Sequence, residues 1–319
     1  MPNNTTRTQM QESFPFLMIQ FCVTTLTLVS NIALVVIVAF SNNLRDLSYN
    51  LIINVSISDI ISSIVMYTYA ITAIRTVPMS EPVGIVVCRL AYGLLITSTI
   101  TSITTLTMIS IYRLKIVTCP LTFRNIIIFK HCNKFIILSW LMSVVFAIPA
   151  FLIGAYNPAI KTCNFGFPYG NIFNVIYFSI ILLFVYSIPG VIILRNYRRV
   201  AICLSSQISD NTAIVHDREA SINRTRSVIR VFIIATLAQT LLSLPYILSI
   251  LTYSILNQSQ LKFLFDNPQF LVVVWLSFTT NMATYLVNPF MFLVFDKNVK
   301  IAMHDLYIRI HDRSSNMKS

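Results

Sequence analysis

One acidic residue lies within the long apolar stretches of the sequence, where polar side chains are costly, and two asparagines match its depth in other stretches. Asp59 lies in INVSISDII, and Asn31 and Asn288 lie at comparable depth in two other stretches. Ionisable groups in such positions suggest function by default. Two compatible interpretations remain open. The three side chains hydrogen-bond together and join their helices, or the carboxylate, facing amides and hydroxyls, holds a sodium ion, because hard cations prefer oxygen ligands.

The composition indicates what kind of protein must position these residues. Of the 319 residues, 56% are hydrophobic and only 11% are charged, and the mean hydropathy is +0.75. Soluble domains carry about 25% charged residues, so the sequence indicates a polytopic membrane protein. The net charge of +12 would suggest nucleic acid in a soluble protein. Because the charges lie in loops between apolar segments, we expect membrane lipid and no nucleic acid as partners.

Seven apolar segments are each long enough to cross a bilayer once as a helix. They are 16–40, 48–74, 87–112, 135–156, 172–194, 228–254 and 270–294. Most of the 23 Lys and Arg residues fall in segments that are inside if the N-terminus is outside, as the positive-inside rule requires. The first segment lacks signal-peptide features and is expected to be an uncleaved anchor.

We therefore expect an extracellular tail, a membrane domain and a cytoplasmic end, in that order: 1–15, 16–295 and 296–319. The cytoplasmic end has apolar residues at helical spacing between charges, which predicts a short amphipathic helix on the inner leaflet, with a disordered basic tail as the alternative. These residues are Val299, Met303, Leu306 and Ile310. Glycosylation sequons on the predicted outer face begin at three positions. They are Asn3, Asn4 and Asn257.

Of the six cysteines, only Cys88 and Cys163 fall on the predicted outer side, where the environment is oxidising. A disulfide between these two is expected, and it would tether the second outer loop over the mouth of the bundle. The others lie in the first segment or near the inner face: Cys22, Cys119, Cys132 and Cys203. The four histidines are scattered on the inner side, so the sequence predicts no metal site built from His and Cys.

These residues, with the prolines that interrupt three later segments, resemble the landmarks of the rhodopsin-like (class A) family of G-protein-coupled receptors over roughly 16–309. They are Asn31, Asp59, Cys88, Arg113, Pro120-Leu121, Trp140, Cys163, Pro189, Tyr197, Pro245, Asn288 and Pro289. The resemblance implies an all-α bundle of seven transmembrane helices in the plasma membrane, with the N-terminus outside and an eighth, amphipathic helix inside. It also implies two partners, an extracellular ligand and a heterotrimeric G protein.

The resemblance also implies roles for individual residues. Arg113 would face the G protein when the sixth helix swings outward, and Tyr197 would stabilise that open state. Asp59, Ser102 and Asn288 would form an allosteric sodium site, and no other cofactor is implied.

Several positions depart from the family pattern. Tyr112 replaces the acid before Arg113, and no acid lies near the inner end of the sixth segment. The carboxylate clamp on Arg113 is therefore missing. Ser243 replaces the sixth-helix tryptophan, Gln239 the phenylalanine of the core switch, and Phe292 the closing tyrosine of N-P-x-x-Y. We hypothesise a lower barrier to activation and raised basal signalling.

Six residues are expected, by helical position, to line an outer ligand cavity. They are Leu95, Thr99, Tyr246, Ser249, Trp275 and Phe278. The alternative is that several simply pack against neighbouring helices. Leu95 stands where amine receptors carry an aspartate, and Met282 where opsins attach retinal, which disfavours an amine and excludes a Schiff base. A small neutral or lipid-like ligand suits this lining better, and a peptide bound by the outer loops stays open.

A transporter or channel is the main alternative class. Such a protein would be expected to show repeated halves, Gly-rich broken helices or several membrane acids. This chain has six glycines in all and one acid within its apolar segments. An enzyme would need a catalytic cluster at the membrane face, and the sequence shows no such set. We therefore expect a receptor and no enzyme.

Overall fold

Seven helices of the structure are long and apolar enough to cross a membrane, which confirms the predicted number of spans. The structure, a computed structural model, describes residues 4–41, 44, 47–73, 79–118, 132–158, 162–209 and 216–316. The helices that cross are α1 Asn4–Phe40, α2 Leu47–Ala73, α3 Glu81–Thr118, α5 Cys132–Ile153, the continuous run of α6 Asn171–Ile181, η3 Leu182–Ser187 and α7 Ile188–Ser209, then α8 His216–Ile255 and α10 Leu271–Phe295.

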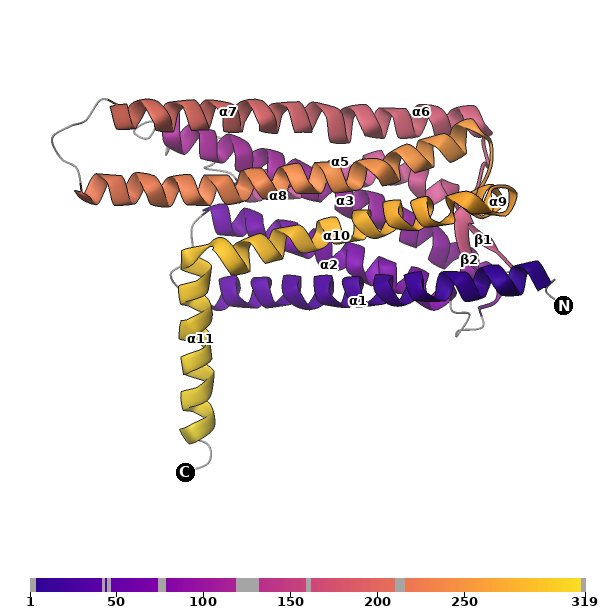
Figure 1. Ribbon diagram of the computed structural model, residues 1–319, viewed down its shortest axis with the longest axis horizontal. Coiled ribbons are helices and arrows are strands. Elements are labelled where there is room, and N and C mark those ends of the chain that lie inside the picture. Colours follow the sequence, from indigo (N-terminus) through magenta and orange to yellow (C-terminus); the bar gives the residue numbers. More distant parts are fainter. Residues whose placement is uncertain are drawn as a thin grey trace.

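Short elements mark the two ends of this bundle. At one end, β1 Gly154–Asn157 pairs antiparallel with β2 Thr162–Phe165, near α9 Gln260–Asp266 and the 3-10 turn η4 Pro268–Phe270. At the other end, α11 Lys297–Asn316 extends sideways from the bundle (Figure 1). We call these the hairpin end and the α11 end.

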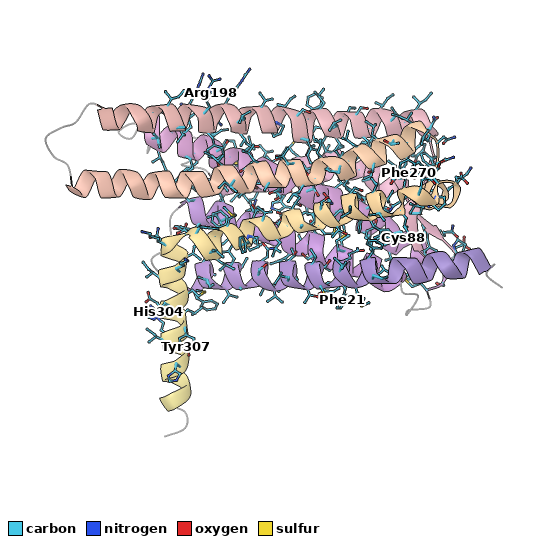
Figure 2. The ribbon with its side chains drawn as sticks, in the orientation of Figure 1. Phe21, Cys88, Arg198, Phe270, His304 and Tyr307 are labelled. Atoms are coloured by element: carbon cyan, nitrogen blue, oxygen red, sulfur yellow. A yellow bond between two sulfur atoms is a disulfide. The ribbon has the colours of Figure 1, made fainter. Side chains whose placement is uncertain are left out.

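Labelled side chains show how the ends differ. Cys88 and Phe270 lie toward the hairpin end, whereas Arg198, His304 and Tyr307 lie toward the α11 end (Figure 2). The first residues of α1 also lie at the hairpin end (Figure 1). Because α1 begins at Asn4, most of the expected tail continues this helix, and the division into three regions stays a prediction.

Helix α3 is the centre of the bundle, since it packs against α2, α5 and α7. Its buried face includes many hydroxyls, and most of them donate to the carbonyl one turn earlier. Thr97 donates to Gly93 O at 2.8 Å, and Thr105 to Thr101 O at 2.7 Å. Such bonds satisfy polar groups where no water is present. Helix α5, in contrast, exposes apolar side chains such as Leu141, as expected for a lipid-facing helix.

Gly154, at the start of β1, lies directly against the backbone of α3. A Cβ there would lie 2.8 Å from Cys88 O and from Arg89 Cα, and backbone atoms cannot move aside as a flexible side chain can. Gly154→Ala is therefore expected to cost about 1–3 kcal/mol through overpacking. The measurement is the apparent thermal midpoint of the purified protein at a fixed scan rate. Gly190→Ala is the matched control, because its Cβ would meet only Thr240 Cγ2, at 3.9 Å; equal midpoints for the two variants would contradict the prediction.

The fifth span contains a wide, π-helical turn, η3, immediately before Pro189. A proline cannot donate a backbone hydrogen bond, and π turns often lie at functional sites. Within η3, Ser187 Oγ donates to Leu182 O at 2.9 Å. The irregularity that the sequence predicts at Pro189 therefore takes the form of a π turn.

Asp296 joins α10 to α11. Its Oδ1 accepts from the backbone N–H groups of Asn298 (2.9 Å) and Val299 (3.3 Å), as an N-capping side chain does. The predicted amphipathic helix is confirmed, but its buried residues differ from the expected set. Val299, Ala302 and Leu306 pack against the bundle, whereas the side chain of Met303 is exposed. The small Ala302 was missed because the pattern was sought in large apolar residues.

Candidate functional site

The predicted disulfide is present at the hairpin end. Cys88 of α3 is bonded to Cys163 of β2, and their Cα atoms are 5.3 Å apart. In the ladder, Cys163 lies opposite Tyr156 of β1, so the bond holds the hairpin against α3. The disulfide therefore fixes the second outer loop to the central helix, as expected.

Four buried side chains form a closed ring of hydrogen bonds in the middle of the bundle. Asp59 of α2 accepts from Ser102 Oγ of α3 (3.3 Å) and from Asn288 Nδ2 of α10 (3.0 Å). Gln239 of α8 completes the ring, since its Nε2 donates to Ser102 Oγ (3.2 Å) and its Oε1 accepts from Asn288 Nδ2 (3.1 Å). We call Asp59, Ser102, Gln239 and Asn288 the polar ring. It joins one residue from each of four helices.

Asn31 has different partners from those first considered. Its Nδ2 donates to Thr27 O and to Tyr285 O, both at 2.9 Å. Asn31 therefore joins α1 to the backbone of α10. The interpretation that the three polar residues hydrogen-bond together is right for Asp59 and Asn288 and wrong for Asn31.

The polar ring has the donor chemistry that a sodium ion requires. Asp59 supplies carboxylate oxygens, Ser102 a hydroxyl and Asn288 an amide oxygen, which hard cations prefer. Asn288 Oδ1 is buried and has no hydrogen-bond partner among the described residues. These residues fit the ion, and Asn288 Oδ1 is an unsatisfied oxygen that it would use. The sodium site stays a prediction.

A second polar junction lies beside the ring. Asn54 Nδ2 of α2 donates to Thr105 Oγ1 of α3 at 2.8 Å, and its Oδ1 accepts from Trp140 Nε1 of α5 at 2.9 Å. Sequence reasoning placed Trp140 as a family landmark but missed Asn54 as its partner. This junction fixes α3 between two neighbours and gives the ring a rigid support.

At the α11 end of α3, the surroundings of Arg113 are aromatic. Its Cζ lies 5.9 Å from the centre of the Tyr112 ring, within the range of a cation–π contact. Tyr197 and Phe292 are buried in one apolar cluster at this end. One turn before Arg113, Asn196 Nδ2 donates to Ser110 Oγ at 3.0 Å and joins α7 to α3, a contact that the sequence did not suggest.

The sixth and seventh helices place their landmark residues differently. Ser243 is buried, and its Oγ donates to Gln239 O of the preceding turn at 2.8 Å. Pro245 is exposed on the outer face of α8, whereas Pro289 is buried in α10. Where the family carries a large tryptophan, Ser243 therefore bonds to its own helix and also interacts with Tyr186 of η3.

The six expected cavity residues lie in the hairpin half of the bundle, and two of them line a small cavity. Leu95 and Tyr246 line a cavity of only about 10 Å³, which is too small for more than one water molecule. The other four contact neighbours. Tyr246 and Trp275 lie edge-on to Phe278, Thr99 Oγ1 is 3.3 Å from Tyr285 Oη, and Ser249 Oγ donates to Ser277 Oγ at 3.4 Å. Their role in ligand binding stays a prediction.

Two of the three predicted glycosylation sites, Asn4 and Asn257, lie at the hairpin end. Asn257 is exposed in the turn between α8 and α9 and has a positive φ of 53°, which asparagine tolerates. Asn4 is the first residue of α1, and Asn3 lies outside the described residues. Whether any of the three carries a glycan stays a prediction.

Comparison with known proteins identifies the family. The family described as 7 transmembrane receptor (rhodopsin family) matches residues 30–292, from within α1 to the end of α10. No match was found among curated proteins. The match spans most of the chain and includes the polar ring, the disulfide and Arg113. The protein is therefore a multi-pass protein of the plasma membrane and belongs to the rhodopsin family of seven-transmembrane signalling receptors.

Proposed function

We propose that this receptor binds an extracellular ligand at the hairpin end and activates a heterotrimeric G protein at the α11 end. The observation that carries the proposal is the composition of α3. One helix holds the disulfide at Cys88, a member of the polar ring at Ser102 and the cation at Arg113. A shift of α3 against its neighbours would therefore change the structure at both the hairpin end and the α11 end.

We infer that the polar ring helps to hold the resting state, and that the contact of Arg113 with Tyr112 is weaker than the bond to an acid that it replaces. A cation–π contact at Tyr112 contributes about 0.5–2 kcal/mol. Hydrogen bonds between ionised groups contribute about 1.5–3 kcal/mol, and such a bond is what the family's acid would give. Gln239, in contrast, bonds to two other helices. The outward swing of α8 that the family uses would have to break both bonds.

The absence of the family's acid before Arg113 predicts measurable basal signalling. In a second-messenger assay without ligand, cells that express the protein are expected to exceed mock-transfected cells. Tyr112→Asp supplies the missing carboxylate and is expected to lower this signal severalfold at equal surface density. Tyr112→Asn is the matched control, because it removes the same ring and adds a side chain of the same size as aspartate without its charge, and it should not lower the signal.

Two outcomes would contradict the proposal. Basal activity no higher than in mock-transfected cells would contradict the prediction that the missing acid lowers the barrier to activation. An ion current that is independent of G protein would instead favour the channel alternative. A ligand screen read out through a promiscuous G protein then addresses the ligand, for which a small neutral or lipid-like molecule suits the aromatic residues around Tyr246 best.

A further inference from the structure

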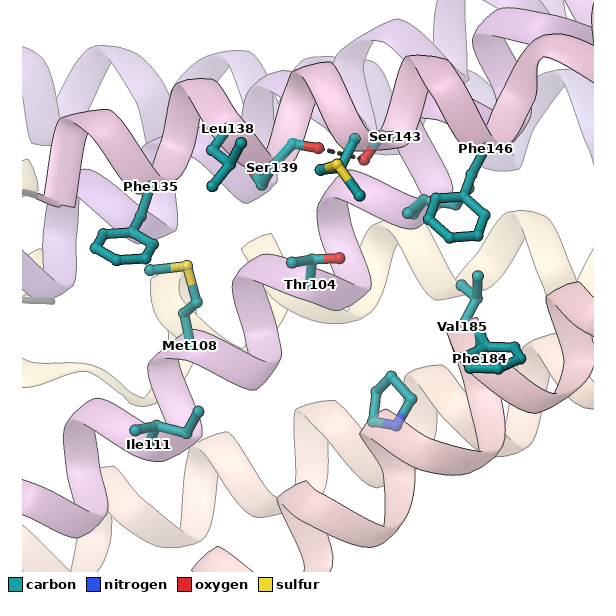
Figure 3. A pocket seen from close by; sticks show the side chains of 13 residues that line it. Thr104, Met108, Ile111, Phe135, Leu138, Ser139, Ser143, Phe146, Phe184 and Val185 are labelled. Carbon is teal, nitrogen blue, oxygen red and sulfur yellow. Dashed lines mark hydrogen bonds between the residues drawn. The ribbon is translucent and has the colours of Figure 1, made fainter.

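A groove of about 470 Å³ lies on the side of the bundle between α3, α5 and the η3–α7 part of the fifth span (Figure 3). Sites for drug-sized ligands measure about 300–1,000 Å³. The cavity beside Leu95 and Tyr246, with about 10 Å³, is far below this range. The described part of the molecule therefore offers ligand-sized space here, away from the outer cavity.

The groove lies at membrane depth. All three helices that line it belong to candidate spans, namely 81–118, 132–153 and 171–203. Its lining is apolar apart from three hydroxyls, and it contains no charged side chain. Figure 3 shows Met108 beside Phe135 at one end and Phe146 near Phe184 and Val185 at the other. A charged molecule would pay a large desolvation cost there, so the groove suits a neutral, lipophilic one.

The three hydroxyls differ in their hydrogen bonding. Ser139 Oγ donates to Ile136 O, and Ser143 Oγ donates to Ser139 O, both at 2.7 Å. Thr104, in the centre of the groove in Figure 3, forms no hydrogen bond with another described residue. Its neighbours on α3 do, as Thr105 and Thr107 donate to the preceding turn. In hydrocarbon no water can satisfy the Thr104 hydroxyl, which leaves it as a donor for a ligand.

We propose that this groove binds a neutral lipophilic molecule of drug-like size that enters from the bilayer and accepts a hydrogen bond from Thr104 Oγ1. The absence of charge in the lining disfavours ionised groups within the groove, and the single open hydroxyl favours a molecule with one carbonyl or hydroxyl group. The bound molecule would contact α3, α5 and the π turn at Val185 together.

The groove also adjoins a hydrogen bond between α3 and α5. Thr101 Oγ1 donates to Ser143 Oγ, which lines the groove, at 2.9 Å. A ligand that fits the groove only when α3, α5 and the fifth span are packed as in this structure stabilises this packing over other conformations. It is therefore expected to lower basal signalling. This regulatory effect, unlike the binding, rests on the proposed receptor function.

The test uses the purified full-length protein in phosphatidylcholine nanodiscs. The probe is hexadecanol that carries a diazirine and an alkyne, and labelled peptides are identified by mass spectrometry. Saturable labelling of groove residues such as Met108 and Met142, removed by excess unlabelled hexadecanol, is the expected result. Labelling that does not saturate and is spread over all lipid-facing helices would overturn the proposal.

Two variants make the test specific. Met142→Trp fills the groove and is expected to abolish labelling of Met108, whereas Val145→Trp, on the exposed face of the same helix, should leave it intact. Thr104→Val retains the shape of the side chain and loses no hydrogen bond within the protein. It should raise the probe concentration needed for half-maximal labelling roughly two- to tenfold. Unchanged half-saturation in Thr104→Val would overturn the assigned donor.

The cell assay separates this proposal from the receptor proposal. Hexadecanol is expected to lower the basal signal of the wild type and not that of Met142→Trp. The nanodisc assay needs no G protein. If the protein never signals, the proposed function is contradicted, but the labelling result still decides whether the groove binds the probe. Saturable labelling with an unchanged signal in an otherwise active receptor would overturn the regulatory effect.

Discussion

Replacing Gln239 with leucine is expected to raise ligand-independent signalling by up to roughly tenfold, because the change removes the two bonds that join α8 to α3 and α10. Gln239 Nε2 donates to Ser102 Oγ at 3.2 Å, and Gln239 Oε1 accepts from Asn288 Nδ2 at 3.1 Å. A hydrogen bond contributes about 0.5–1.5 kcal/mol net; with both bonds near the lower end of this range, their loss amounts to about 1.4 kcal/mol, which changes an equilibrium tenfold. If the bonds exist only in the closed arrangement, their loss shifts the population toward the open one.

The control for this variant lies on the next residue. Thr240 Oγ1 donates to Thr236 O of its own helix at 3.0 Å, so Thr240→Val changes α8 without changing its bonds to α3 or α10. Basal second messenger, divided by surface density, should rise in Gln239→Leu and stay level in Thr240→Val. Equal basal signals in these two variants and the wild type would show that the polar ring does not restrain α8.

A double variant tests whether the ring acts as a unit. Ser102→Ala removes the partner of Gln239 Nε2 and one donor to Asp59. Because both changes break the same contact, their combined effect should be smaller than the sum of the two, with a coupling of about 0.5–3 kcal/mol. Additive effects would mean that the bond between Gln239 and Ser102 does not hold the resting state, and that Gln239 acts through Asn288 or through packing.

Much of the fold follows from sequence because it depends on length and polarity along the chain. A bilayer requires about 20 apolar residues per helix, so the seven spans can be counted directly. The disulfide follows from compartment, since Cys88 and Cys163 were the two cysteines on the outer side. Asp59 and Asn288 could be paired because both are strongly polar and lie at comparable depth.

The remaining contacts depend on how each helix is rotated about its own axis, which depth does not determine. Asn31 lies at a comparable depth but faces the carbonyl of Tyr285. Gln239 was visible as a departure from the family, yet its bonds to Ser102 and Asn288 connect residues 137 and 49 positions apart. Such contacts require the packed bundle. The small volume beside Tyr246 likewise depends on the side-chain conformations of the surrounding rings.

Replacing both Cys88 and Cys163 with serine is expected to cost about 2–5 kcal/mol of stability, the usual effect of losing a native disulfide. The two residues are 75 positions apart, so the bond closes a long loop and restricts the unfolded chain strongly. Hydrogen bonds between described residues also anchor the hairpin. Gly166 N donates to Ile153 O at 2.8 Å, and Asn174 Nδ2 donates to Gly166 O at 3.0 Å.

The measurement is the apparent thermal midpoint of the purified protein at a fixed scan rate, together with surface display in cells. Dithiothreitol should lower the midpoint of the wild type toward that of the double variant and leave the double variant unchanged. Cys22→Ala is the control, because Cys22 is an exposed free cysteine of α1.

If the double variant kept the wild-type midpoint, packing alone would hold the hairpin against α3. Gly154 packs so closely against α3 that a Cβ would lie 2.8 Å from Cys88 O, and this packing would then be the main anchor of the hairpin. Gly154→Ala would in that case lower the midpoint more than loss of the disulfide, which reverses the order expected here.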